Sequence, residues 1–299
     1  MKQLKARKGP WLVSLGSALW ATDSLFRSNL ISKFPTMFIV FLDHLLAMLV
    51  AIPLFLREWK QILKFNLKDW LSLVGISLGG SVLGLVFFTQ SFAITSNYTV
   101  PVLIQKVQPI IAILLAALIL KEKLTKNFWL WSAIAIIGAY FVSFGTLSVS
   151  LENAAWLPVF YAFLAAVFWG SSTVFGKYLS KKYTFSFITS VRYIGGLIWL
   201  AIIMLFMNQW FEFTNLDGKS LLIFLGIALI PGFLALIIYY MGLKTTKASV
   251  ATICELTFPL TAIVLNWILL DSALNLIQIL GAIVLLGAIT MLSLKGQKK

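Results

Sequence analysis

The sequence predicts an all-α integral membrane protein with ten transmembrane helices, arranged as two inverted five-helix repeats. Of its 299 residues, 60% are hydrophobic and 11% are charged, whereas soluble domains carry about 25% charged residues. Ten apolar stretches are each close to the roughly 20 residues that a helix needs to cross a bilayer. The second five stretches echo the first five at an offset of about 149 residues. An odd number of crossings in each repeat inverts the second repeat relative to the first.

The apolar stretches set the expected elements and repeats. The repeats are expected at residues 1–150 and 151–299. Helices are expected at residues 11–30, 36–57, 69–94, 98–120, 127–147, 155–177, 184–208, 219–242, 248–270 and 274–294. The basic, apolar N-terminal stretch is interpreted as a retained first helix, because its core continues to Leu30 without a convincing signal-peptide cleavage site.

Basic residues between these stretches predict the orientation. Only Lys33 and Lys219 fall on one side of the membrane. The other side holds the gaps that contain Lys2, Lys5, Arg7, Lys8, Arg57, Lys60, Lys64, Lys68, Lys121, Lys123, Lys126, Lys177, Lys181, Lys182, Lys244, Lys247, Lys295, Lys298 and Lys299. The positive-inside rule then predicts cytoplasmic N- and C-termini in an inner or plasma membrane. This placement also explains the net charge of +14 without a nucleic-acid partner.

Two short segments carry the internal repeat most clearly. The heptapeptide 20–26, Trp-Ala-Thr-Asp-Ser-Leu-Phe, matches 169–175, Trp-Gly-Ser-Ser-Thr-Val-Phe. The pentapeptide 105–109, Gln-Lys-Val-Gln-Pro, corresponds to 255–259, Glu-Leu-Thr-Phe-Pro. Two such correspondences in the same order favour duplication of a five-helix unit.

This ordered set of motifs resembles the drug/metabolite transporter superfamily, specifically its ten-helix EamA type. The resemblance covers the whole chain and implies a transporter that works by alternating access around a central cavity. The chain departs from the pattern at three places. Ala21 stands where the second repeat has a glycine, and Asp43-His44 stand where the second repeat has Arg192. After the ninth helix, Asp271-Ser272 only weakly match the acidic turn that the first repeat has at 121–124.

Ionisable residues inside the predicted helices are the candidate site, because a charge within the bilayer is costly unless it is paired or hydrated. Depth along the helices predicts one set in the outer half, made of Asp43, His44, Gln105 and Lys106. Arg192 and Glu255 form the expected inner set. Each set either lines a polar cavity that binds substrate or forms a structural ion pair, and for Asp43, His44 and Arg192 both interpretations stay open.

Lys106 and Glu255 are favoured as functional groups, since each precedes a proline that permits a helix kink. Lys106 would attract a carboxylate, and Glu255 would attract an ammonium group or exchange a proton. Asp23 and Arg27, one helical turn apart, are expected to pair with each other, with Arg27 reaching toward the outer surface.

Aromatic residues supply further candidates. Trp20 and Trp169 occupy matching places near mid-depth, where they could wall a cavity. Tyr239, Tyr240 and Gln90 are similar but weaker candidates. With a single histidine and a single cysteine, neither a metal site nor a cofactor is expected.

The predicted function is secondary active transport of a small polar metabolite, such as an amino acid or a related amine, with a proton as the candidate coupling ion. The first four helices of each repeat are expected to line the path, and the fifth and tenth helices to pack at the periphery. The expected partners are the substrate and the lipid bilayer, and the expected state is a monomer or homodimer. No Walker, GxSxG or HExxH motif occurs, so catalysis is not expected. The rival classes are an intramembrane lipid-modifying enzyme and a polytopic receptor.

Overall fold

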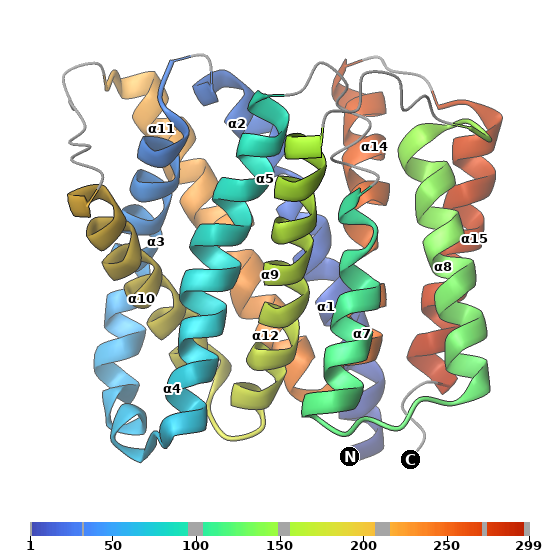
Figure 1. Cartoon of the computed structure of the whole chain (residues 1–299), viewed down its shortest axis with the longest axis horizontal. Coiled ribbons are helices and arrows are strands. Elements are labelled where there is room, and N and C mark those ends of the chain that lie inside the picture. Colours follow the sequence, from blue (N-terminus) through green and yellow to red (C-terminus); the bar gives the residue numbers. More distant parts are fainter. Residues whose placement is uncertain are drawn as a thin grey trace.

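The computed structural model describes residues 2–31, 33–94, 104–148, 156–206, 216–270 and 274–295, and this part of the chain is helical, without strands (Figure 1). In the first half the helices are α1 Lys2–Trp20, α2 Asp23–Ile31, α3 Thr36–Glu58, the 3₁₀ segment η1 Trp59–Lys64, α4 Leu67–Val74, the π-helical segment η2 Gly75–Leu83, α5 Gly84–Ala93, α7 Gln108–Ile119 and α8 Lys126–Phe144. In the second half they are α9 Trp156–Ser180, α10 Phe185–Phe206, α11 Gly218–Ile227, the π-helical segment η4 Ala228–Leu234, α12 Ala235–Thr245, α13 Ala248–Cys254, α14 Thr257–Leu270 and α15 Leu276–Lys295.

Eight helical stretches among the described residues are long and apolar enough to cross a membrane. They are Thr36–Lys64, Leu67–Ser91, Lys126–Phe144, Trp156–Ser180, Phe185–Phe206, Gly218–Thr245, Ala248–Leu269 and Leu276–Leu294. The other two predicted spans correspond to α1 with α2, where α1 begins with basic residues, and to α7, which has only 12 residues. The count of ten therefore stays a prediction.

The arrangement in Figure 1 separates the two ends of the bundle. At the lower face α1 begins, α15 ends, and η1 and the connections at 120–125 and 181–184 are found. At the upper face α2 ends and α11 begins. The lysine-rich connections thus share one face, as the sequence predicts.

Helix ends follow local signals in the sequence. Asn66 and Asp69 form a capping box at the start of α4. The Thr125 side chain accepts a hydrogen bond from the Phe128 amide at the start of α8. That helix ends at Gly145, whose positive φ of 63° suits glycine.

Glycines bring neighbouring helices into close contact. A Cβ atom added at Gly84 would lie 2.6 Å from Nε1 of Trp169, and one at Gly80 would overlap the Ser172 hydroxyl. The α1–α12 contact depends in the same way on Gly16, where an added Cβ would lie 2.9 Å from the Ala235 carbonyl oxygen. Glycines that let two helices approach closely in this way are typical of helix packing in membranes.

Three helical interruptions are the features that shape the centre of the molecule. α1 and α2 are separated at Ala21-Thr22, and two turn residues precede each of α7 and α14, at 106–107 and 255–256. Pro109 and Pro259 lie in the first turn of the helices that follow, where proline is tolerated. The helices are thus interrupted next to the prolines at which the sequence permits a kink. The predicted single helix 248–270 is therefore two helices, and 98–103 lie outside the described residues.

Candidate functional site

A cavity of about 780 Å³ lies among the interrupted helices and is the candidate site. Its volume is within the roughly 300–1,000 Å³ range of small-molecule sites. All nine sequence-predicted site residues line it, namely Trp20, Asp43, His44, Gln105, Lys106, Trp169, Arg192, Tyr239 and Glu255. No lining residue that the structure describes belongs to α8 or α15, which pack against each other. The expected peripheral position of the fifth and tenth helices is therefore observed.

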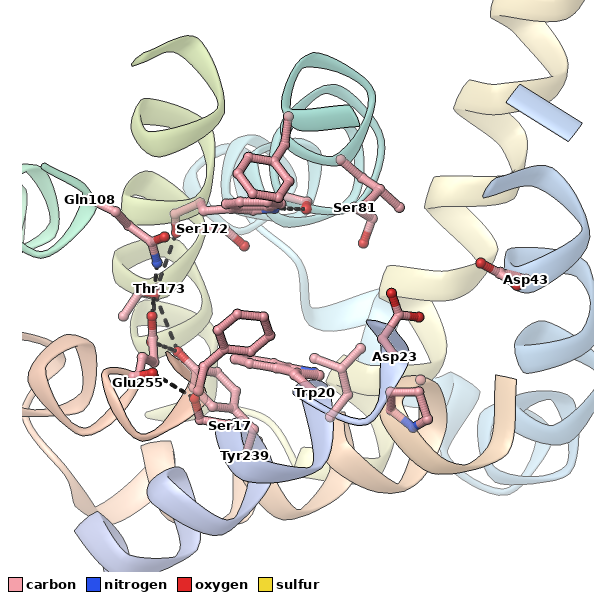
Figure 2. Close-up of a pocket in the computed structure, with 18 of the residues that line it drawn as sticks. Ser17, Trp20, Asp23, Asp43, Ser81, Gln108, Ser172, Thr173, Tyr239 and Glu255 are labelled. Carbon is pink, nitrogen blue, oxygen red and sulfur yellow. Dashed lines mark hydrogen bonds between the residues drawn. The ribbon is translucent and has the colours of Figure 1, made fainter. Parts of the chain in front are cut away.

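Glu255 forms the best-satisfied polar cluster of the cavity (Figure 2). Its Oε1 accepts hydrogen bonds from the Tyr239 hydroxyl at 2.7 Å and the Thr173 hydroxyl at 3.0 Å. Its Oε2 accepts one from Nε2 of Gln108 at 2.9 Å. The Ser17 hydroxyl donates to the Glu255 main-chain oxygen at 2.7 Å. Neutral donors from α1, α7, α9 and α12 thus converge on the interruption between α13 and α14.

Arg192 lines the cavity together with Glu255, but among the described residues no ion pair joins the two side chains. Its Nε donates to the Ser81 hydroxyl at 2.8 Å, and its NH1 group donates to the Tyr240 hydroxyl at 3.0 Å. A weaker contact joins NH1 to Ser172 at 3.3 Å. Hydroxyl groups hold this guanidinium because the glycines of η2 bring α9 and α10 close to the serine-bearing segment.

A second charged cluster, the Arg27 triad, joins Arg27 to Asp23 and Asp43. Arg27 donates to both oxygens of Asp23, at 2.5 and 2.8 Å, and to Oδ2 of Asp43 at 2.9 Å. The predicted Asp23–Arg27 pair is confirmed. Arg27 does not reach the outer surface as predicted, because its side chain is only 15% exposed and lines the cavity. Asp43 pairs with Arg27 rather than with the predicted partners Gln105 and Lys106.

His44 and Lys106 have few partners. Nδ1 of His44 lies 2.8 Å from the Val40 carbonyl oxygen, and the ring meets Tyr193 edge-on at 5.6 Å. Its Nε2 is buried without a hydrogen bond from any described residue. Lys106 lines the cavity at the interruption before α7 and, within the described part of the chain, forms no ion pair.

Aromatic rings form two walls of the cavity. Trp20 and Tyr239 pack with ring centroids 4.9 Å apart. Trp169 packs 5.0 Å from Phe88 and donates from Nε1 to the Gly80 carbonyl oxygen at 3.1 Å. The predicted cavity positions of both tryptophans and of Tyr239 are observed. Of the three weaker candidates only Tyr239 lines the cavity: Gln90 is exposed, and Tyr240 is fully buried behind the lining, where its hydroxyl accepts from Arg192.

Several cavity residues were not predicted from the sequence, and they are neutral. Gln108 and Thr173 hold the Glu255 carboxylate, and Ser81 and Ser172 hold Arg192. A signal for three of them was present, since Gln108, Ser172 and Thr173 lie in the repeated motifs 105–109 and 169–175. Buried hydroxyl and amide groups are common in helix packing, so these residue types alone do not indicate a site.

The geometry describes a binding cavity within a helical membrane bundle. It combines aromatic walls, neutral hydrogen-bonding groups and buried charges of both signs at interrupted helices. Within the described residues no three metal-ligating side chains gather. The fold and site thus define a polytopic membrane protein with an internal, aromatic-walled chamber.

Comparison with known proteins identifies the family. A sequence model of the EamA-like transporter family matches residues 7–144 and 156–294, so the chain belongs to this family of multi-pass membrane transporters. It is 33% identical over 293 residues to the riboflavin transporter ImpX of Fusobacterium nucleatum, covering 96% of this chain and 97% of the relative. It is 28% identical over 246 residues to an uncharacterized transporter of Methanothermobacter thermautotrophicus, covering 81% of this chain and 69% of the relative.

A solved crystal structure supports the fold. It superimposes with a TM-score of 0.75 over 97% of this chain and 99% of the solved chain. Its sequence identity of 16% carries no information about substrate.

Proposed function

We propose that this transporter carries riboflavin or a closely related flavin across the cell membrane by secondary transport. The observation that carries the proposal is the aromatic-walled cavity, formed by the Trp20–Tyr239 and Trp169–Phe88 pairs. The name of the F. nucleatum relative, which matches nearly end to end, supplies the substrate class.

The chemistry of a flavin suits this lining. The isoalloxazine ring system is flat, aromatic and uncharged, so it gains from stacking on rings such as Trp20. Its carbonyl and imide groups and the hydroxyls of the ribityl chain need hydrogen-bond partners. Neutral groups such as Gln105, Thr89 and Ser172 line the cavity and supply them. Because the ligand is neutral, the buried charges are expected to serve positioning and coupling rather than ligand neutralisation.

The transport mode proposed is alternating access between two inverted five-helix repeats, residues 1–150 and 151–299. The two consecutive matches to one family model support this division. The paired interruptions at 106–107 and 255–256 also support it, since they occupy corresponding places in the two halves. The lysine-rich face in Figure 1 would be cytoplasmic, with both termini on that side.

A zwitterionic metabolite such as an amino acid is the second candidate, favoured by one observation. Lys106 and Glu255 carry opposite charges and line the same cavity. Against this candidate, three neutral hydrogen bonds already satisfy the Glu255 carboxylate.

Binding by the purified protein tests the proposal. Flavin fluorescence is quenched when the ring stacks on tryptophan or tyrosine, so titrating the protein into riboflavin should give saturable quenching. Neither ribitol nor an amino acid should reverse the quenching. Proteoliposomes loaded with riboflavin should then take up labelled riboflavin by exchange. Absence of both quenching and exchange, with amino acids taken up instead, would establish the second candidate.

A further inference from the structure

We infer that the Arg27 triad is a proton-binding site that couples transport to the pH gradient, with Oδ1 of Asp43 as the atom that takes the proton. The inference rests on the proposed transport function and adds its driving ion. It concerns a part of the cavity away from the Glu255 cluster: Figure 2 shows Asp23 and Asp43 on one side and Glu255 with Gln108 on the other.

The triad carries one more negative than positive charge when both of its carboxylates are ionised. A single guanidinium serves two carboxylates, with contacts of 2.5 Å to Asp23 and 2.9 Å to Asp43. An ion pair inside a membrane can be neutral overall, but a surplus charge there is costly. One added proton makes the triad neutral.

The unpartnered oxygen identifies where the proton binds. Asp43 is 8% exposed, its Oδ2 accepts from Arg27, and its Oδ1 is buried without a hydrogen-bond partner among the described residues. A buried ionised oxygen without a donor loses its hydration and gains nothing in return. Asp23, in contrast, uses both oxygens to bind Arg27.

None of the neighbouring titratable groups forms an ion pair that would neutralise the surplus negative charge of the Arg27 triad. On α3 itself His44 uses Nδ1 to contact Val40. From α10, Tyr193 and Arg192 face the same region, and Arg192 is held by the Ser81 hydroxyl. The cavity-lining residues of η4 and α5 are Ala228, Pro231, Gly232, Leu85, Phe88 and Thr89, none of which titrates near neutral pH.

Glu255 is the obvious alternative proton site, and its environment differs in one respect. Three donors already contact its carboxylate, from Tyr239, Thr173 and Gln108. These neutral donors favour the ionised form, whereas Oδ1 of Asp43 has no donor in the described chain. Glu255 therefore serves here as a fixed acceptor that orients the substrate-binding groups.

A proton fits this site better than a metal cation. Sodium needs several oxygen ligands around it, and among the described residues no three acidic, histidine or cysteine side chains gather here. The guanidinium of Arg27 also occupies the position between the two carboxylates. A proton needs only the single free oxygen.

Coupling follows from the burial of that oxygen. When water reaches Asp43 on the acidic side, hydronium transfers a proton to Oδ1, an O–H bond forms, and water is left. The neutral triad then stabilises the conformation seen in this structure, in which Oδ1 of Asp43 is buried away from water. Opening toward the other side rehydrates Oδ1, and the proton returns to water. One proton accompanies each cycle.

Transport in proteoliposomes tests the site with Asp43→Asn, which keeps the side-chain shape and an acceptor for Arg27. With one proton per cycle, an imposed gradient should accumulate riboflavin up to about tenfold per pH unit, because a factor of ten corresponds to 1.4 kcal/mol. Asp43→Asn should abolish this accumulation while keeping riboflavin exchange within about threefold of the wild type. The matched control is the exposed Asp217→Asn, which should keep gradient-driven accumulation.

Infrared difference spectroscopy gives a readout that needs no substrate. A protonated carboxylic acid has a distinct carbonyl band, which should rise on acidification of the wild type and be missing in Asp43→Asn. Asp23→Asn removes one of the two negative charges, so that Arg27 pairs with Asp43 alone. The carbonyl band of protonated Asp43 should then appear only at more acidic pH. A band that persists in a folded Asp43→Asn protein, or vanishes instead in Glu255→Gln, would overturn the assignment.

The two proposals fail separately. If riboflavin is neither bound nor exchanged but the Asp43 band is present, the substrate is wrong and the proton site stands. If riboflavin is accumulated by a sodium gradient at equal pH, or by a pH gradient in Asp43→Asn, the site is wrong and the substrate stands.

Discussion

The hydroxyl of Tyr239 donates a 2.7 Å hydrogen bond to Oε1 of Glu255, while the Tyr239 ring packs 4.9 Å from Trp20. One side chain therefore joins the aromatic wall of the cavity to its best-satisfied carboxylate. Because Glu255 lies at an interruption between two helices, this contact also ties α12 to the junction of α13 and α14.

Tyr239→Phe should separate these two roles. The ring stays, but the Glu255 carboxylate loses one of its three donors, and a hydrogen bond to a charged group contributes about 1.5–3 kcal/mol. We expect riboflavin to bind roughly 10- to 150-fold more weakly, measured by fluorescence quenching. Thr173→Val removes a second donor to the same oxygen and should act in the same direction. Unchanged affinity in both variants would remove Glu255 from the binding site.

Trp20→Ala should weaken flavin binding by removing a stacking surface. A base stacked on an aromatic side chain contributes about 1–3 kcal/mol, and the flavin ring is a comparable flat system. We therefore expect a loss of roughly tenfold or more in affinity, with partial recovery in Trp20→Phe. Trp129→Ala is the matched control, because Trp129 is 47% exposed on α8 and is not among the residues that line this cavity. Equal effects at both positions would indicate general destabilisation.

Glu122→Ala should lower thermal stability without abolishing substrate binding. The Glu122 carboxylate accepts hydrogen bonds from the amides of Ala248 and Ser249, at 2.8 and 3.1 Å, and so caps α13 from the connection at 120–125. Loss of a cap of this kind costs about 0.5–2 kcal/mol. Glu122→Gln should cost less, because an amide oxygen still accepts. The exposed neighbour Lys123 provides the control, and a melting temperature equally lowered in Lys123→Ala would contradict the capping role.

Alkaline pH should destabilise the fold through Tyr183, in the connection before α10. Burial and its 2.9 Å hydrogen bond to Asp69 raise the pKa of Tyr183 from 10.0 to about 12. Between these values the unfolded chain releases the proton and the folded chain keeps it, so stability falls as pH rises. Melting temperatures should therefore be steady near neutral pH and decline above about pH 10. Tyr183→Phe should reduce that decline; an identical pH profile would contradict the assignment.

From the sequence we could predict which residues line the cavity better than which of them contact one another. Depth within apolar stretches identified Lys106 and Glu255, and the nearby prolines identified the interrupted helices, because both signals are local. Pairing between helices is not local. Arg27 reaches Asp43 only because α2 folds back beside α3, and Arg192 meets hydroxyls because glycines let the helices approach.

The neutral partners escaped prediction for a related reason. Gln108 and Thr173 become important only because they converge on the Glu255 carboxylate from different helices. A lone amide or hydroxyl in an apolar stretch has the same local pattern whether it faces lipid, another helix or a cavity.

The π-helical segments η2 and η4 fix the rotational phase of the helices that follow them. In an α-helix successive residues advance by about 100°, since one turn takes 3.6 residues, whereas the wider π turn advances less. Phe88 on α5 and Tyr239 on α12 both come after such a segment and both face the chamber. Retightening η4 into regular α geometry would swing Tyr239 around its helix axis and away from Glu255. A local change of winding, with every side chain kept, is thus enough to dismantle or rebuild the binding surface.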